Sequence, residues 1–223
     1  MSELTKRLNV DVARAERIIV PSGDDNERCI ESFQKEFDIE IPEFEGKSRK
    51  VVSGGKTFFK LKGIDIPGYV AGGYADIGLT GTDSAKENQG YGRDFVVTPI
   101  ESRPMCTFMI LAREDCVAWG LSLFSGSGRE EVQELATSFP RNLMRAAARL
   151  CLPAIPSGVP VTGGVEGAAE LLGLPFAADL VVTGESALAN NMVPIKLLDE
   201  IYPAIITPAT SVPGREEPFC ASR

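Results

Sequence analysis

The stretch Ala178-Asp179-Leu180-Val181-Val182-Thr183-Gly184-Glu185-Ser186 decides the fold class that we predict for this chain. An apolar run with one acidic residue predicts a buried strand, and Thr-Gly predicts the end of that strand. A short helix is expected directly afterwards, from Ser186 to Met192. Unpaired N–H groups at this turn, with the hydroxyl groups of Thr183 and Ser186, favour an anion site. An ordinary strand–turn–helix connection is the alternative interpretation.

A second strand end of the same type lies about a hundred residues earlier in the chain. The stretch from Tyr74 to Asp83 again places an acidic residue and an apolar run before Thr80-Gly81. In open α/β sheets, ligands bind at the carboxyl ends of the strands. Two such strand ends, supplied by two lobes, predict a ligand cleft between the lobes.

Two further glycine turns follow or precede predicted elements. Ser22-Gly23 follows a short β-branched strand, and Gly163-Gly164 opens a helix that runs through Leu172. Glycine allows the backbone to approach a ligand closely. Both turns are also compatible with plain connections between strands and helices.

Composition restricts the chemistry. The 223 residues carry a net charge of −8, which argues against general nucleic-acid binding. No apolar run reaches the ~20 residues that span a membrane, and the charged N-terminal stretch lacks an apolar signal core, so we expect a cytoplasmic protein. The five cysteines form no CxxC pair, and histidine is absent. Disulfide frameworks, zinc sites and histidine general bases are therefore excluded, which leaves carboxylates, lysines, arginines, backbone dipoles and a hard metal ion.

Gly54-Gly55 separates two short β-branched or aromatic runs, Lys50–Ser53 and Thr57–Leu61, and therefore predicts a hairpin. The alternation of side chains along a strand places Lys60 and Lys62 on one face. That face is either exposed to solvent or forms a phosphate clamp.

A helix up to Cys151 is expected to begin at Pro140, with Thr137 or Ser138 as its N-cap. Arg141, Arg145 and Arg149 recur one turn apart on that helix. The arginine stripe suits a phosphate, a subunit partner or plain solvent. The preceding Ser/Gly-rich segment, 121–129, is predicted to be a loop.

With these segments placed, the chain resembles the ATP phosphoribosyltransferase family of histidine biosynthesis, in the short form without a C-terminal regulatory domain. The resemblance extends from about Arg17 to Ile206. It rests on five motifs in the expected order, which are Ile64–Val70, Ala75–Gly81, Ala136–Pro140, Gly164–Glu166, and Asp179–Gly184 with Asn190.

The resemblance implies an α/β fold with mixed sheets, two-lobed like the type II periplasmic binding proteins, and a ligand cleft between the lobes. Residues 1–99 with 189–223 would form the nucleotide lobe, and residues 100–188 the lobe that binds phosphoribosyl pyrophosphate (PRPP). The implied reaction transfers the 5-phosphoribosyl group from PRPP to N1 of ATP and releases pyrophosphate. Mg²⁺ is the implied cofactor. A homo-oligomer, or a hetero-oligomer with a histidyl-tRNA-synthetase-like regulatory subunit, is the implied assembly.

The resemblance also assigns site residues, with no direct protein ligand for the metal. The PRPP group is Asp179, Thr183, Gly184, Glu185, Ser186 and Ala187; the nucleotide group is Ser22, Gly23, Lys60, Lys62, Thr80, Gly81 and Asp83; other cleft residues are Gly163, Gly164 and Glu166.

Three departures from the family pattern leave alternatives open. Asp24 stands where a basic residue is usual, Leu174-Pro175 replaces an Ala-Asp pair, and Glu185 places an acid beside the predicted phosphate loop. A diverged phosphoribosyltransferase with another heterocyclic acceptor fits these changes. A non-catalytic two-lobed small-molecule-binding protein, or an inactive paralogue that serves as a subunit, is also compatible with them.

Overall fold

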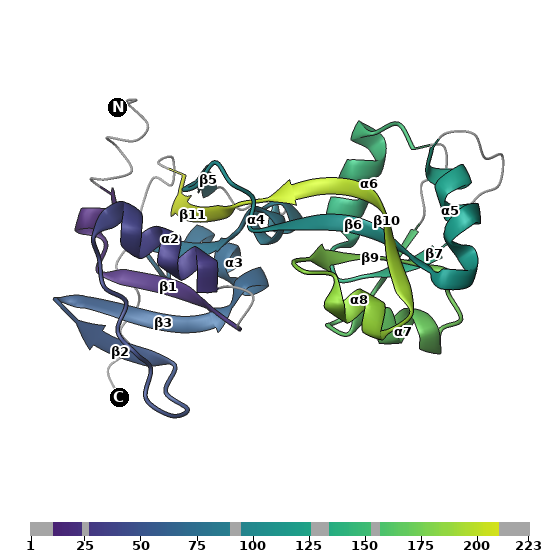
Figure 1. Ribbon diagram of the computed structural model, residues 1–223. Helices are drawn as coiled ribbons and strands as arrows, with labels where there is room; N and C mark the ends of the chain where they lie inside the picture. The colour runs from purple at the N-terminus through teal and green to yellow at the C-terminus, as the bar shows by residue number, and fades with distance from the viewer. Residues whose placement is uncertain (1–10, 24–26, 90–94, 126–133, 153–156, 210–223) are drawn as a thin grey trace, which may run out of the picture.

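Two α/β lobes joined by two chain crossings make up the computed structural model, which describes residues 11–23, 27–89, 95–125, 134–152 and 157–209 (Figure 1). The first lobe contains a six-stranded sheet in the order β2-β3-β1-β4-β11-β5. The second contains a five-stranded sheet in the order β10-β6-β9-β7-β8. Both sheets combine parallel and antiparallel pairs, which confirms the predicted two-lobed fold with mixed sheets. Asp24 lies outside the described residues, as do the predicted loop positions from 126 onward.

The first lobe combines the N-terminal part of the chain with the last strand. Its strands are β1 (Arg17–Ser22), β2 (Lys50–Ser53), β3 (Lys56–Lys62), β4 (Ile77–Gly81), β5 (Phe95–Pro99) and β11 (Pro203–Pro208). Its helices include α2 (Glu27–Phe37), α3 (Ile66–Ala71) and α4 (Thr82–Asn88), with a 3-10 turn at Gly63–Asp65.

The second lobe is formed by the middle of the chain. Its strands are β6 (Cys106–Arg113), β7 (Glu134–Thr137), β8 (Ser157–Pro160), β9 (Phe176–Val181) and β10 (Met192–Ile201). Its helices include α5 (Val117–Phe124), α6 (Pro140–Arg149), α7 (Val165–Leu171) and α8 (Glu185–Ala189), with a 3-10 turn at Glu114–Cys116.

Both faces of the first sheet are buried, which explains why β1 reads as a continuous apolar run rather than an alternating one. Ile18 and Val20 pack with Phe33 of α2 on one face. Ile19 points the other way and packs with Ile66 of α3. The second sheet is built the same way, with α6 over one face and α7 over the other. Because helices cover the faces, the strand ends remain as the open part of each lobe.

The two crossings run side by side and are hydrogen-bonded to each other. Met105 N–H donates to Ile201 O at 2.7 Å, and Ile100 N–H donates to Pro203 O at 2.9 Å. β10 therefore belongs to the second sheet, where it pairs with β6, and the chain returns to the first lobe only at Tyr202. The predicted second lobe ends at residue 188 and thereby assigns β10 to the first lobe. The sequence of a returning strand does not reveal which of the two sheets it joins.

The secondary-structure predictions fare differently from element to element. The Gly54-Gly55 hairpin is confirmed, with β2 and β3 antiparallel. The loop predicted from residue 121 is wrong for residues 121–124, which form the end of α5, because its apolar side chains Leu123 and Phe124 are buried in the core. The helix predicted up to Met192 ends at Ala189, because Asn191 takes a left-handed conformation with φ 54°.

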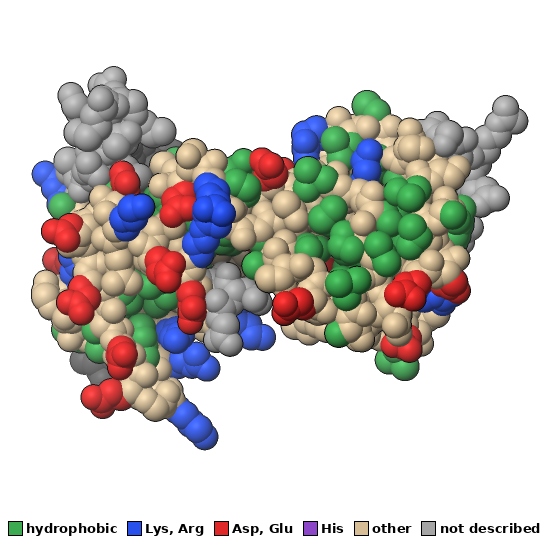
Figure 2. Space-filling view, in the orientation of Figure 1, with side chains coloured by type: hydrophobic (Ala, Val, Ile, Leu, Met, Phe, Trp, Pro, Cys, Tyr) green, Lys and Arg blue, Asp and Glu red, His purple; other side chains and the backbone are tan. Residues whose placement is uncertain are grey.

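The exposed surface differs between the lobes. Figure 2 shows charged side chains spread over the first lobe, whereas hydrophobic side chains gather over β10 and α5 of the second. Trp119, Leu121 and Leu197 contribute large exposed apolar side chains to that lobe. No helix among the described residues has both the length and the apolar character needed to cross a membrane.

We predict that the hydrogen bonds to Asp76 stabilise the contact between the start of β1 and the start of β4. Its carboxylate accepts hydrogen bonds from the N–H groups of Glu16 and Arg17 and from the Arg17 guanidinium, at 2.8–3.0 Å. Burial alone would raise the pKa of this carboxyl, but the hydrogen bonds and the Arg17 charge lower it. Asp76→Asn should lower the free energy of unfolding at pH 7 by about 1–3 kcal/mol, measured by urea denaturation.

The pH dependence gives this prediction a second readout. The stabilisation is present above the unfolded aspartate pKa of about 3.9 and is lost as pH falls through the lower folded pKa. The stability difference between wild type and Asp76→Asn should therefore shrink below pH 4. An unchanged difference down to pH 2 would contradict the assignment.

Candidate functional site

A cleft of about 510 Å³ lies between the two lobes, at the ends of the strands that the sequence singled out. The second lobe supplies most of its lining, through the β9–α8 connection and the start of α7. The first lobe supplies the 3-10 turn after β3 and the start of α4. The lining residues are Gly63, Ile64, Asp83, Ser84, Met105, Cys106, Ser138, Phe139, Gly163, Gly164, Glu166, Asp179, Leu180, Val181, Val182, Thr183, Gly184, Ser186 and Ala187.

Five of the six residues predicted to bind PRPP line the cleft, and they lie in β9, in α8 and in the connection between them. Gly184 has φ 82°, a left-handed conformation that L side chains rarely adopt, so the turn into α8 requires glycine. Thr183 Oγ1 accepts a hydrogen bond from Glu185 N–H at 3.3 Å and so stabilises the start of α8. Glu185 itself is exposed and is absent from the cleft lining.

Glu166 ties the start of α7 to the start of α8. Its side chain is buried, and its carboxylate accepts a hydrogen bond from Ser186 Oγ at 2.9 Å. The preceding Gly163 and Gly164 have φ 75° and 59°, and a Cβ atom built on either would meet no other atom within 4 Å. The predicted glycine turn therefore presents open backbone to the cleft, next to a carboxylate held in place by the neighbouring helix.

Asp83 is the acidic group that the first lobe contributes to the cleft. It is 4% exposed, and its Oδ1 atom has no hydrogen-bond partner among the described residues. Ser84 Oγ donates to its other oxygen at 3.2 Å. Burial raises the pKa of this carboxyl, and the hydrogen bonds from Ser84 oppose that rise. Asp83 thus places a buried carboxyl with one unpaired oxygen in the first-lobe wall of the cleft.

Thr80 and Gly81 support Asp83 rather than line the cleft. Thr80 is fully buried, and its hydroxyl donates to Gly63 O at 3.0 Å, which fixes the turn that does line the cleft. A Cβ atom on Gly81 would lie 2.0 Å from Asp83 Oδ1. The Thr-Gly pair predicted as a nucleotide contact therefore lies behind the first-lobe wall of the cleft and packs against it.

The remaining predicted nucleotide residues lie at the carboxyl ends of β1 and β3. Ser22 is aligned with Lys62, and the next residue, Gly63, lines the cleft. Gly23 follows β1 with φ 106°, which explains why glycine occupies that position. The Lys60 ammonium lies 5.7 Å from the centre of the Phe44 ring, a cation–π contact on the first sheet. None of these four residues lines the cleft itself.

Sequence reasoning missed several lining residues. Met105 and Cys106 arrive through the first chain crossing, and Ser138 and Phe139 through the turn before α6. Their neighbours along the chain carry no ligand-binding pattern. The Ala136–Pro140 motif was the available signal for Ser138 and Phe139, but it was interpreted as the start of a helix and as a family motif, without a role in the site.

Comparison with known proteins assigns the chain to a family. A family model described as ATP phosphoribosyltransferase matches residues 62–217. The chain belongs to the ATP phosphoribosyltransferase family. An ATP phosphoribosyltransferase from Clostridium novyi is 24% identical over 207 residues, which cover 90% of this chain and 91% of that protein.

Solved structures support the same fold for this family member. The ATP phosphoribosyl transferase (HisG:HisZ) complex from Thermotoga maritima matches with a TM-score of 0.62 at 20% identity, over 86% of each chain. The periplasmic aliphatic sulphonate binding protein SsuA from Escherichia coli matches with a TM-score of 0.50 at 17% identity, over 86% of this chain and 64% of that one. The predicted periplasmic-binding-protein-like architecture is confirmed.

We expect that Asp83 lowers the stability of the ligand-free protein. Its folded pKa is raised, so its carboxyl costs no stability below the unfolded pKa of about 3.9, and the cost grows as pH rises through the folded pKa. Asp83→Asn should therefore raise the free energy of unfolding by about 1–2 kcal/mol at pH 7 and leave it nearly unchanged near pH 3. Denaturant unfolding at both pH values measures this, and a variant less stable than wild type at pH 7 would contradict it.

Proposed function

We propose that this chain is the catalytic subunit of an ATP phosphoribosyltransferase, which transfers the 5-phosphoribosyl group of PRPP to N1 of ATP with release of pyrophosphate. The observation that supports the proposal is the shared cleft, in which the segment 179–187 of the second lobe, proposed to bind PRPP, and the buried Asp83 of the first lobe line one space. The two substrates would thus approach from opposite lobes.

The second lobe is proposed to hold PRPP. Thr183 would bind the 5′-phosphate through its hydroxyl, and Gly184 and Ser186 through their backbone N–H groups, because the Ser186 hydroxyl proton is donated to Glu166. Asp179, near the C-terminal end of β9, would accept hydrogen bonds from the ribose hydroxyls. The open backbone at Gly163 and Gly164 leaves room for the sugar to approach, and Glu166 keeps Ser186 oriented through its 2.9 Å hydrogen bond.

The chemistry suits a chain without histidine. The C1–O bond to pyrophosphate breaks as the C1–N1 bond forms, and positive charge develops on the ribose ring in the transition state. The carboxylates of Asp179 and Glu166 favour that charge, and a ring nitrogen that already carries a lone pair needs no deprotonation. Holding the two reactants in line is then the main contribution of the protein.

Mg²⁺ is proposed as the cofactor. Among the described residues, no group of three or more Cys, Asp or Glu side chains is arranged to hold a metal ion. Mg²⁺ commonly binds through one or two carboxylates plus substrate phosphates, and carboxylates of that kind, Asp83 and Asp179, line the cleft. When bound, the ion would neutralise charge on the departing pyrophosphate.

The first lobe is proposed to hold ATP. Asp83 would offer its carboxylate to the exocyclic amine of adenine once its side chain turns toward the cleft, with the Ser84 hydroxyl beside it. Lys62, at the end of β3 next to Gly63, would reach the nucleotide phosphates. The triphosphate would then extend along the strand ends toward Ser22 and Gly23.

A second candidate is a diverged phosphoribosyltransferase that uses another heterocycle. Pro175 replaces the usual acidic residue before β9, and its carbonyl accepts a hydrogen bond from Arg113 N–H at 3.0 Å, so the position serves the sheet rather than a ligand.

For the assembly, we propose a homo-oligomer or a complex with a histidyl-tRNA-synthetase-like subunit, supported by the HisG:HisZ complex among the structural relatives.

Pyrophosphate release tests the function. Purified chain, PRPP, Mg²⁺ and ATP should release pyrophosphate and form phosphoribosyl-ATP, with no release when ATP is omitted. PRPP binding by titration calorimetry without turnover on ATP would favour the diverged enzyme. Absence of PRPP binding would reject both candidates and leave a binding protein for another small molecule.

We predict that two substitutions in the PRPP loop abolish PRPP binding. Asp179→Asn removes the negative charge and one of the two acceptor oxygens offered to the ribose hydroxyls, and Gly184→Val strains a backbone held at φ 82°. Each should weaken PRPP binding about 100-fold or more, measured by calorimetry. Glu170→Gln, an exposed change on α7 outside the cleft lining, is the matched control and should bind normally. Unchanged binding by Asp179→Asn would remove that residue from the site.

A further inference from the structure

The N-terminus of α6 is capped by the other lobe. Neither predicted cap residue, Thr137 or Ser138, supplies an acceptor to the helix start. Thr137 Oγ1 instead accepts a hydrogen bond from Phe139 N–H at 3.0 Å. Glu87, near the end of α4 in the first lobe, supplies the missing acceptors. One of its carboxylate oxygens lies 3.0 Å from Arg141 N and the other 2.8 Å from Asn142 N. Both N–H groups at the start of this helix therefore depend on a single side chain from across the lobe boundary.

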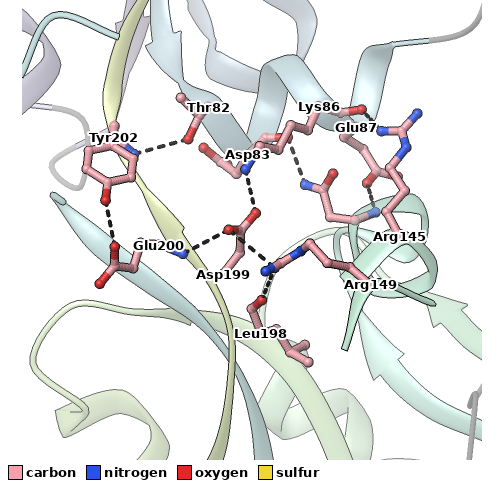
Figure 3. Close-up of polar contacts among 11 residues, drawn as sticks. Thr82, Asp83, Lys86, Glu87, Arg145, Arg149, Leu198, Asp199, Glu200 and Tyr202 are labelled. Atoms are coloured by element: carbon pink, nitrogen blue, oxygen red, sulfur yellow. Dashed lines mark hydrogen bonds and ion pairs between the residues drawn. The ribbon is translucent and has the colours of Figure 1, made fainter. Parts of the chain in front are cut away.

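The arginine stripe of α6 strengthens the same contact. Arg145 donates to the carbonyl oxygens of Lys86 and Gln89, at the end of α4. Arg149 pairs with Asp199 of β10 at 3.5 Å, and Asp199 also pairs with Lys86 of α4 (Figure 3). The stripe left open between phosphate, partner and solvent in the sequence thus lies at the joint between the lobes.

This joint lies directly behind both walls of the cleft. α4 begins with Asp83 and Ser84, which line the first-lobe wall, and Glu87 is one turn further along the same helix. Ser138 and Phe139 line the second-lobe wall and immediately precede α6. Asn142 connects the two walls directly, because its side-chain amide donates to Asp83 O at 2.8 Å.

We propose that Glu87 is a positioning residue for the cleft. By capping α6 from α4, its carboxylate fixes the separation and angle between the wall that carries Asp83 and the wall that carries the PRPP loop. The catalytic part of this proposal rests on the proposed function, since the fixed separation of the walls would serve to align ATP with PRPP. The PRPP loop is contained entirely in the second lobe, so PRPP binding alone does not require the joint.

Substitutions at Glu87 separate positioning from general stability. Glu87→Gln keeps the length and one acceptor oxygen, whereas Glu87→Ala removes both acceptors. Glu31→Ala, an exposed glutamate in the middle of α2, is the matched control. Hydrogen exchange at the first-turn amides of α6 should be about 2- to 30-fold faster in Glu87→Ala, intermediate in Glu87→Gln and unchanged in the control.

Three further measurements complete the test. With ATP as the varied substrate, kcat/KM should fall about tenfold or more in Glu87→Ala, while the PRPP dissociation constant stays within about twofold of wild type. Small-angle scattering of the ligand-free variant should give a larger radius of gyration than wild type. Rescue in Glu87→Gln should be partial for every readout.

Each alternative outcome is distinct. Faster amide exchange with unchanged kcat/KM and unchanged scattering would overturn the proposal and leave Glu87 as a helix cap only. Equal losses of PRPP binding and turnover would also overturn it, because they indicate general destabilisation. If wild type itself shows no turnover, the proposed function fails, and amide exchange with scattering still decides whether Glu87 sets the lobe geometry.

Discussion

The pair of hydrogen-bonded chain crossings is the constraint on which the rest of the molecule depends. Met105 and Ile201 meet at one end of it, and Ile100 and Pro203 at the other. The crossings place two sheets with covered faces end to end, so the free strand ends of both lobes open onto one shared space. A ligand in that space contacts backbone turns and short helix starts, which can supply N–H donors without any basic cluster. The proposed phosphate binding is therefore compatible with a net charge of −8.

The joint between α4 and α6 limits the freedom that the crossings would otherwise leave. Two crossings alone resemble a hinge, whereas Glu87, Arg145 and the Lys86–Asp199–Arg149 pairs add a second line of contact beside them. Exposed ion pairs contribute little each, but a carboxylate that satisfies two helix N–H groups is more costly to remove. The buried Asp83, one of whose carboxylate oxygens is unpaired, lies beside this joint, so the joint and the first-lobe wall of the cleft share the helix α4.

Local sequence determined much of the fold and about half of the site. Strands buried on both faces, such as β1 and β9, left continuous apolar runs. Of the two Thr-Gly ends, Thr183-Gly184 lines the cleft, whereas Thr80-Gly81 lies behind its wall. The sheet to which β10 belongs was not predictable, since it depends on a register of pairing with β6 far away in the chain. The cap of α6 was missed for the same reason: Glu87 lies more than fifty residues before the N–H groups that it binds. Lys60 was predicted from its charge and from strand alternation, and neither of them reveals that Phe44 is its neighbour.

A shared cleft for two substrates is the central claim, and hydrogen–deuterium exchange of the whole chain tests it most directly. We predict that PRPP with Mg²⁺ protects residues 163–166 and 179–187, and that adding a non-reactive ATP analogue extends protection to residues 63–64 and 81–84 on the opposite wall. Protection by the ATP analogue on surfaces remote from residues 63–64 and 81–84, or PRPP protection confined to the first lobe, would contradict a common site between the lobes.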